Sequence, residues 1–169
     1  MATLTAFKFS TPEGAGQMLT KVEAMQKTQL IKVQEAAIVT WPAGSKKPRT
    51  KQLANMAGVG ALQGAFWGML FGLIFFVPFF GMAVGAAMGA LTGKFTDYGI
   101  NDDFIKQSRE KVTEGTSALF LLTSQAVTDK VLDELKGFQF ELLASNLTKE
   151  QEAELMAAFA EPQSTAAGG

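Results

Sequence analysis

Hydrophobic and polar residues follow two different patterns along the chain. In the two flanking regions, apolar residues alternate with polar ones at the short periods of strands and helices. Between Lys51 and Lys94, in contrast, there is no Asp, Glu, Lys or Arg, and this 42-residue block holds nine of the seventeen glycines. The pattern predicts a small soluble domain interrupted by a hydrophobic insertion.

The region before the insertion predicts a strand, a helix and a second strand. Leu4 to Phe9 alternates as a strand does, and Thr11-Pro12 predicts an N-cap followed by proline at the first helical position. The apolar face of the helix comprises Ala15, Met18, Leu19, Val22 and Met25. Lys32 to Trp41 predicts the second strand, and Trp41 to Thr50 a loop or irregular hairpin arm. One side of this strand would carry Val33, Ala37, Val39 and Trp41, and the other Ala36, Ile38 and Thr40.

The region after the insertion repeats this order. Ser117 to Thr123 predicts a strand, Thr128 an N-cap for a short helix, and Phe138 to Leu143 another strand. Two βαβ units that share one antiparallel sheet predict an α+β, ferredoxin-like (split βαβ) fold with its helices on one face. The expected limits are 1–52 and 94–147 for this domain, 53–93 for the inserted hairpin, 148–160 for a C-terminal helix capped by Thr148 and Gln151, and 161–169 for a disordered tail.

Glycines recur every fourth residue on both sides of Pro78 in the insertion. A step of four residues advances an α-helix by about 400°, so each set forms a ridge on one helix face. Helix backbones can approach closely along such a ridge, as in small-xxx-small contacts within lipid. We therefore predict a glycine-zipper helical hairpin whose oligomerisation and helix contacts are made by Gly60, Gly64, Gly68, Gly72, Gly81, Gly85, Gly89 and Gly93.

The two arms of this hairpin differ in length. At 1.5 Å per residue, Leu53 to Phe76 would be roughly 36 Å long and Phe79 to Gly93 only about 22 Å, so only the first could span a bilayer unaided. The turn between them is apolar and contains Phe75, Phe76, Pro78, Phe79 and Phe80. Such a tip suits a re-entrant membrane hairpin or one that ends against protein in a soluble assembly, and both alternatives stay open here.

Charged residues flank the insertion at both ends. Lys46, Lys47, Arg49 and Lys51 precede it, and Lys94 follows it. The positive-inside bias places both ends on the cytoplasmic side of a membrane, and the N-terminus lacks the pattern of a secretory signal. The basic residues before the insertion either form a solvated loop or contact anionic lipid headgroups. Asn55 and Gln63 could hydrogen-bond between neighbouring helices.

The composition gives little support to an enzyme. The chain contains no His and no Cys, which removes the commonest metal ligands, general bases and thiol nucleophiles. The only polar cluster that could be imagined as a site is Asp97, Asp102 and Asp103 with Tyr98. We interpret it structurally, with Asn101 or Asp102 capping a helix from Asp103 to Lys111 and Gly99 turning the chain. Gly14-x-Gly16 lacks the remainder of a phosphate-binding loop.

Several segments together resemble a bacterial family known as domain of unknown function 1269, described as glycine-rich predicted membrane or stress-related proteins. They are Glu35-Ala36-Ala37-Ile38-Val39, the glycine-spaced hairpin, Thr96-Asp97-Tyr98-Gly99-Ile100 with Asp102-Asp103-Phe104, and Ser117-Ala118-Leu119-Phe120. The resemblance implies a ferredoxin-like domain with an inserted hairpin and supplies no activity. The phenylalanine-rich turn departs from the family pattern.

These observations predict a non-enzymatic, homo-oligomeric scaffold on the cytoplasmic face of the inner membrane, with lipid and other copies of itself as partners. A soluble cytoplasmic assembly that senses a small molecule is the alternative, by analogy with other ferredoxin-like sheets. We expect no catalytic residue, cofactor or metal. The net charge of −1 argues against nucleic acid as a partner.

Overall fold

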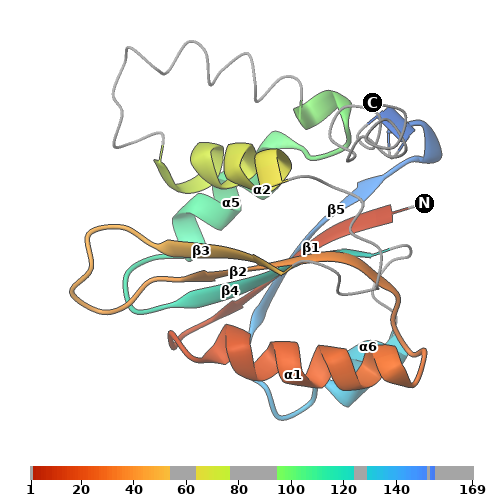
Figure 1. Cartoon of the computed structure of the whole chain (residues 1–169), viewed down its shortest axis with the longest axis horizontal. Coiled ribbons are helices and arrows are strands. Elements are labelled where there is room, and N and C mark those ends of the chain that lie inside the picture. Colours follow the sequence, from red (N-terminus) through yellow and green to blue (C-terminus); the bar gives the residue numbers. More distant parts are fainter. Residues whose placement is uncertain (1, 54–63, 77–94, 124–128, 152, 155–169) are drawn as a thin grey trace, which may run out of the picture.

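The computed structural model describes residues 2–53, 64–76, 95–123, 129–151 and 153–154, and it shows an α+β fold. A five-stranded sheet lies between two layers of helices (Figure 1). The strands are β1 (Ala2–Phe9), β2 (Val33–Thr40), β3 (Arg49–Leu53), β4 (Ser117–Thr123) and β5 (Glu141–Leu147). The helices are α1 (Gly14–Lys27), α2 (Gly64–Phe71), the π-helical segment η1 (Gly72–Phe76), α5 (Asp102–Lys111) and α6 (Asp129–Glu134).

The strands are arranged in the order β3-β2-β4-β1-β5, and every neighbouring pair is antiparallel. The central pairs join segments that are far apart in sequence. Thr3 lies opposite Thr123 on β4, and Ala2 lies opposite Leu147 on β5. Strands β1, β2 and β4 occupy the expected positions, whereas β3 adds a regular fifth strand where we expected a loop or an irregular arm.

Helices α1 and α6 cover one face of the sheet (Figure 1). The predicted apolar face of α1 is buried there, although Leu19 is only half-buried. The prediction that Thr11 caps this helix was wrong. Helix α1 begins at Gly14, and Ser117 on β4 takes the capping role because its Oγ accepts from Ala15 N at 3.0 Å and donates to Thr11 O at 2.6 Å.

Two strand predictions also need correction. A β-bulge between Val33 and Glu35 reverses the side on which the first part of β2 points. Val33 therefore joins Ala36 in the core under α1, while Ala37 and Val39 face the other way. Strand β5 begins at Glu141 and not at Phe138. Its buried positions are Leu143, Ser145 and Leu147, and Phe138 packs beneath α1 before the strand starts.

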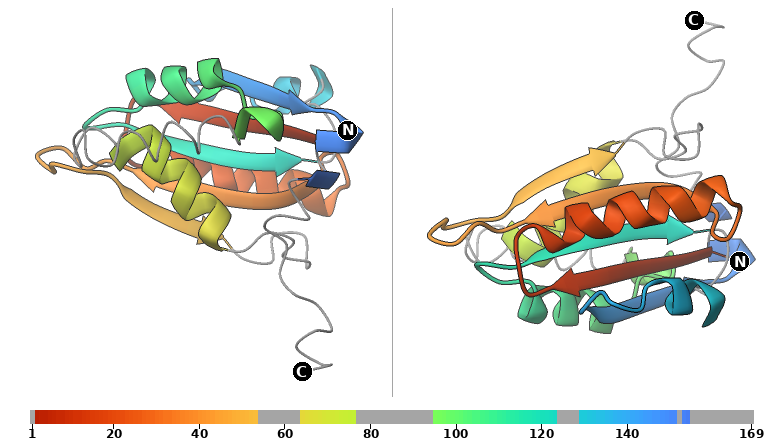
Figure 2. Two further views of the ribbon diagram at one scale, coloured as in Figure 1. Left: turned by 90° about the horizontal axis from the view of Figure 1, so that it is seen from above. Right: turned by 90° about the horizontal axis from the view of Figure 1, so that it is seen from below.

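A second layer of helices, formed by α2, η1 and α5, covers the other face of the sheet. Helix α2 lies over the β2–β3 side and α5 over the β1–β5 side (Figure 2). The expectation that helices occupy one face only was therefore wrong. The physical reason is that the first part of the predicted hairpin folds back and supplies apolar side chains to this face.

The first arm of the predicted hairpin is also not a helix from its beginning. Leu53 is the last residue of β3 and pairs with Ala36. Helix α2 begins at Gly64 and continues into η1, which ends at Phe76. Residues 54–63 and 77–94, which include the second predicted arm, lie outside the described residues.

Local capping signals were more reliable. Asn101 caps α5, because its Oδ1 accepts from Phe104 N at 2.8 Å. Thr148 and Gln151 form the predicted reciprocal capping box, with distances of 2.9 and 3.1 Å. Thr128, residue 152 and residues 155–169, which include the end of the predicted C-terminal helix and its tail, lie outside the described residues.

Candidate functional site

The segment Gly64–Phe76, which comprises α2 and η1 and is called the arm below, has one face buried against the sheet. Its large side chains there are at most 3% exposed. The ring of Phe71 lies edge-on to Phe120 of β4 at 5.1 Å between centroids, and Phe66 contacts Phe95 at 5.9 Å. The buried residues of the arm are Phe66, Trp67, Leu70, Phe71, Leu73, Ile74 and Phe75.

The opposite face of the arm points to solvent and carries the predicted glycines. Gly68 is exposed and Gly72 is half-buried. A Cβ atom added at either position would meet nothing within 4 Å. Met69 lies on the same side and is 42% exposed. The arm thus combines a buried face of bulky side chains with an outward face of bare backbone, and we call the latter the glycine face.

A polar contact fixes the end of the arm to α5. The guanidinium of Arg109 donates to the carbonyl oxygen of Ile74 at 3.0 Å and to that of Leu73. Both carbonyls belong to η1, the π-helical segment in which the regular α-helical hydrogen-bond pattern is interrupted. Arg109 therefore satisfies carbonyl groups at the end of the arm and holds it beside α5.

The remaining predicted hairpin residues fall into two groups. The side chain of Phe75 is buried in the core, and Phe76 is the last residue of η1. Gly64 is the first residue of α2. The others lie outside the described residues, namely Gly60, Pro78, Phe79, Phe80, Gly81, Gly85, Gly89 and Gly93, together with Asn55, Gln63 and Lys94.

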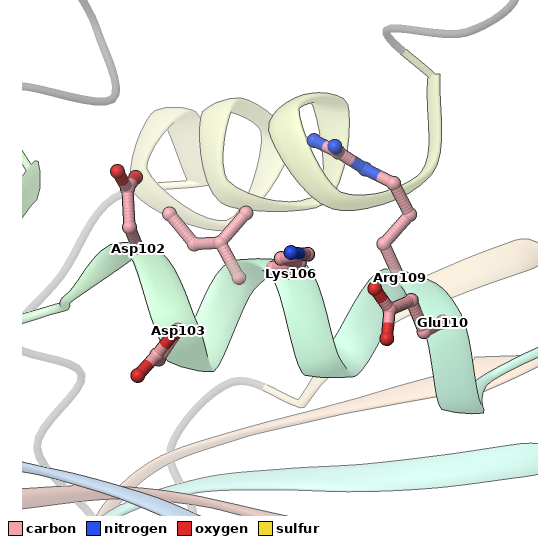
Figure 3. A pocket seen from close by; sticks show the side chains of 6 residues that line it. Asp102, Asp103, Lys106, Arg109 and Glu110 are labelled. Atoms are coloured by element: carbon pink, nitrogen blue, oxygen red, sulfur yellow. The ribbon is translucent and has the colours of Figure 1, made fainter.

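The acidic cluster does not form a convergent site. Asp102 and Asp103 line an open depression of about 520 Å³ on α5 together with Ile105, Lys106, Arg109 and Glu110. Figure 3 shows that the two aspartates point in different directions and that Arg109 extends toward the arm. Among the described residues, no three His, Cys, Asp or Glu side chains are grouped so that they could hold a metal ion. Asp102 and Asp103 instead occupy the first turn of α5, where negative charge favours the helix dipole.

The segment around Gly99 has a structural role. Gly99 has a φ of +96°, and an added Cβ would lie 2.8 Å from Oε1 of Gln151. Its carbonyl accepts from Oγ of Ser145, which also accepts from Asn101 N at 3.3 Å. This network joins the start of α5 to β5, and glycine readily adopts the positive φ of the turn.

Gly14 likewise serves close contact and not phosphate binding. A Cβ at Gly14 would lie 2.4 Å from Cβ of Phe9, so the start of α1 can pass β1 only without a side chain. Gly16 has open space around it and is exposed.

Two features of the arm were not anticipated from the sequence. Arg109 looks like an ordinary exposed residue near the end of a helix, and only the fold shows that it reaches 35 residues back along the chain. The indole nitrogen of Trp67 is buried and has no hydrogen-bond partner among the residues that the structure describes. Because the residues around Trp67 are apolar or glycine on all sides of the helix, the sequence did not predict whether its side chain is buried or which way it points.

The arm, α5 and the last two strands all lie within a region that matches a known family. The family described as "Protein of unknown function (DUF1269)" matches residues 61–160, more than half of the chain. The chain belongs to this family. The matched region begins after β3, so the Glu35-to-Val39 strand lies outside it. No curated protein and no solved structure gives a significant match. Within the described part of the chain, every helix is too short or too polar to reach across a bilayer.

Proposed function

We propose that this protein is a non-enzymatic, homo-oligomeric scaffold that assembles through its glycine face at the cytoplasmic side of the inner membrane. We infer a ferredoxin-like domain as its head. The inference is supported by the strand order: without β3, the sheet reads β2-β4-β1-β5, which is the antiparallel order of two interlocked βαβ units. Strand β3 and the arm are then additions between those units.

The observation that carries the proposal is the outward orientation of Gly68 and Gly72. A glycine in a helix costs about 1 kcal/mol relative to alanine. Neither glycine relieves a contact within the described structure, since an added Cβ would meet nothing within 4 Å. Close approach by another helix explains why bare backbone is placed there. The same spacing of four residues recurs at Gly81, Gly85, Gly89 and Gly93 in the sequence, which offers a complementary ridge for a neighbouring copy.

A non-enzymatic role is supported by the chain's chemistry. There is no His or Cys in the sequence, and the carboxylates of α5 diverge and lie beside Lys106 and Arg109. Membrane association is supported by the apolar, charge-free sequence that continues beyond the arm to Lys94. One face of the arm is buried in the core. We therefore assign lipid contact to the other residues of the charge-free block 52–93.

Replacing Gly68 by Leu tests assembly directly. The added side chain has space in the isolated subunit and improves helix propensity by about 1 kcal/mol, so the subunit should become more stable while its oligomer dissociates. Gly16→Leu is a matched control, because Gly16 is also an exposed helical glycine with open space. Light scattering after size-exclusion chromatography, with and without detergent, gives the mass of each variant.

The outcomes separate the parts of the proposal. An oligomer that survives Gly68→Leu and Gly72→Leu contradicts the glycine face as its contact. A wild-type protein that is monomeric with and without detergent contradicts assembly altogether. Carbonate washing of cell membranes tests location: an oligomer that is released entirely into the soluble fraction contradicts membrane insertion and identifies the soluble assembly instead.

A further inference from the structure

Four cations lie on the hairpin formed by β2, the following turn and β3. Lys46 and Lys47 lie in the turn, and Arg49 and Lys51 lie on β3. All four are exposed, and we call them the hairpin cations. Figures 1 and 2 show that the turn of this hairpin extends past the helices of both layers. Lys46 and Lys47 are therefore presented at a projecting end of the molecule, and Arg49 and Lys51 follow on the adjoining edge strand.

None of the hairpin cations forms an ion pair with another described residue, whereas Lys8, Lys21, Lys111 and Lys136 each do. The carboxylate of Glu114 contacts the turn that carries the lysines, where its Oε2 accepts from Gly44 N at 2.7 Å. That carboxylate is thus engaged with the backbone of the turn. The charge of the hairpin cations remains available to an external anion.

The turn that carries the lysines is held by its own hydrogen bonds. Trp41 Nε1 donates to Ser45 O at 2.9 Å, Ser45 N donates to Pro42 O at 3.0 Å, and Ser45 Oγ donates to Lys47 O at 2.9 Å. Pro48, which follows the two lysines and precedes β3 in the sequence, is buried. These contacts fix the backbone from which the cations project, so binding does not require ordering a loose loop.

Protection of a sheet edge explains two of the four hairpin cations, those on β3. β3 is the outermost strand, and cations on an edge strand discourage pairing with another chain. Arg49 and Lys51 are two residues apart and share one face of β3, opposite Thr40 and Ile38. Lys46 and Lys47, however, precede the strand and border no free ladder. Their position calls for a different explanation.

We propose that the hairpin cations bind the headgroups of anionic phospholipids at a membrane surface. This inference rests on the membrane association proposed above and names the lipid chemistry involved. Lys51 is the last charge before the apolar block, which places the cations at the boundary between water and an inserted segment.

A nucleic acid is a poorer occupant for this surface. The chain has a net charge of −1, so the remainder carries −5 once the four hairpin cations are set aside. A long polyanion that followed the protein surface would meet that negative charge, whereas a flat membrane can contact the projecting end alone.

The test is binding of the full-length protein to vesicles of phosphatidylcholine alone and of equal parts phosphatidylcholine and phosphatidylglycerol. The test variant combines Lys46→Gln, Lys47→Gln, Arg49→Gln and Lys51→Gln. Each cation removed should weaken partitioning onto the anionic vesicles by about fivefold, giving a loss of several hundredfold overall. Raising ionic strength from about 0.1 M to 1 M should weaken the wild type similarly, because the Debye length falls from about 10 to 3 Å.

The control variant combines Lys27→Gln, Lys32→Gln, Lys130→Gln and Lys149→Gln, which changes the net charge equally at exposed lysines elsewhere. We expect it to bind anionic vesicles nearly as the wild type does. An equal loss in both variants overturns the inference. A second contrary result is that the wild type binds neutral vesicles as tightly as anionic ones, with no effect of the four substitutions. That result overturns the inference but leaves membrane association standing. Failure of the wild type to bind either vesicle overturns both. A short RNA serves as a third ligand, and a test variant that loses only RNA binding overturns the headgroup inference alone. Assembly is tested independently by Gly68→Leu.

Discussion

On the α1 side of the sheet, each covering helix connects two strands that follow one another along the chain, whereas the other side is covered by part of the insertion together with α5. The residues that fill the two sides differ as well. The α1 side is mainly aliphatic and contains Met18 and Met25, while the arm side concentrates aromatic rings. The buried aromatic residues described on the arm side are Phe66, Trp67, Phe71, Phe75, Phe95, Phe104 and Phe120.

This difference shows why hydrophobicity alone is a poor guide to membrane insertion in this protein. The arm contributes seven large buried side chains to the core, so part of the apolar insertion is needed to close the sheet. What remains outward on the arm is the glycine face. An insertion of this kind can both complete a domain and present a surface for contact with another helix.

The comparison predicts the largest effect at Phe71, which is 3% exposed and contacts Phe120. Phe71→Ala should lower the free energy of unfolding of the whole domain by about 3–5 kcal/mol, because it leaves a cavity between arm and sheet. Met69→Ala on the same helix should change it by no more than about 0.5 kcal/mol, since Met69 is largely outside the core. Urea denaturation followed by circular dichroism measures both. An unchanged midpoint for Phe71→Ala would mean that the arm is not part of the folded core.

A smaller effect is expected at Gly14, on the α1 side. Gly14→Ala places a Cβ 2.4 Å from Cβ of Phe9, and the resulting displacement of α1 should cost about 1–3 kcal/mol. Gly16→Ala, two residues along the helix, should instead stabilise the protein by up to about 1 kcal/mol. Thermal unfolding of the two variants gives opposite signs if α1 is seated as described. A neutral Gly14→Ala would indicate a looser α1 side.

The smallest effect should follow from loss of the Arg109 contact. Arg109→Gln removes a charged donor from the carbonyls of Leu73 and Ile74, at a cost of about 1–2 kcal/mol. Hydrogen exchange should accelerate in the arm before it accelerates in α1, which separates the polar contact from apolar burial. Arg109→Lys should recover part of the protection. Uniform acceleration across both sides of the sheet would show that the arm does not open separately.

Local signals in the sequence identified much of the fold. The strand predicted for Ser117–Thr123 gave β4 with its observed limits, and the capping box at Thr148 and Gln151 was correct. These signals succeed because the interacting residues are neighbours in the chain. The coarse α+β class followed from the same short-range patterns.

The errors came from interactions between distant residues. Ser117 replaces Thr11 at the start of α1, although the two residues are 106 positions apart. The bulge in β2 depends on pairing with β4, and single-strand periodicity cannot reveal it. Phe71 and Phe75 are buried against the second face of the sheet. The sequence did not show that this face needs a covering segment, because the strands that form it are far apart along the chain. Arg109 was missed for the same reason. The predicted role of Gly68 and Gly72 in helix contacts between copies stays a prediction.

The strand pairing also has a consequence for how the protein is made. The sheet face that receives the arm includes Phe120 on β4 and Leu143 and Leu147 on β5, all of which follow the arm in the chain. At about 5–20 residues per second, the ribosome takes several seconds to supply these strands after the arm has been synthesised. During that interval the arm has no complete face to cover. The order of synthesis therefore gives a chaperone or a membrane the first opportunity to bind this segment, and the finished sheet only the second.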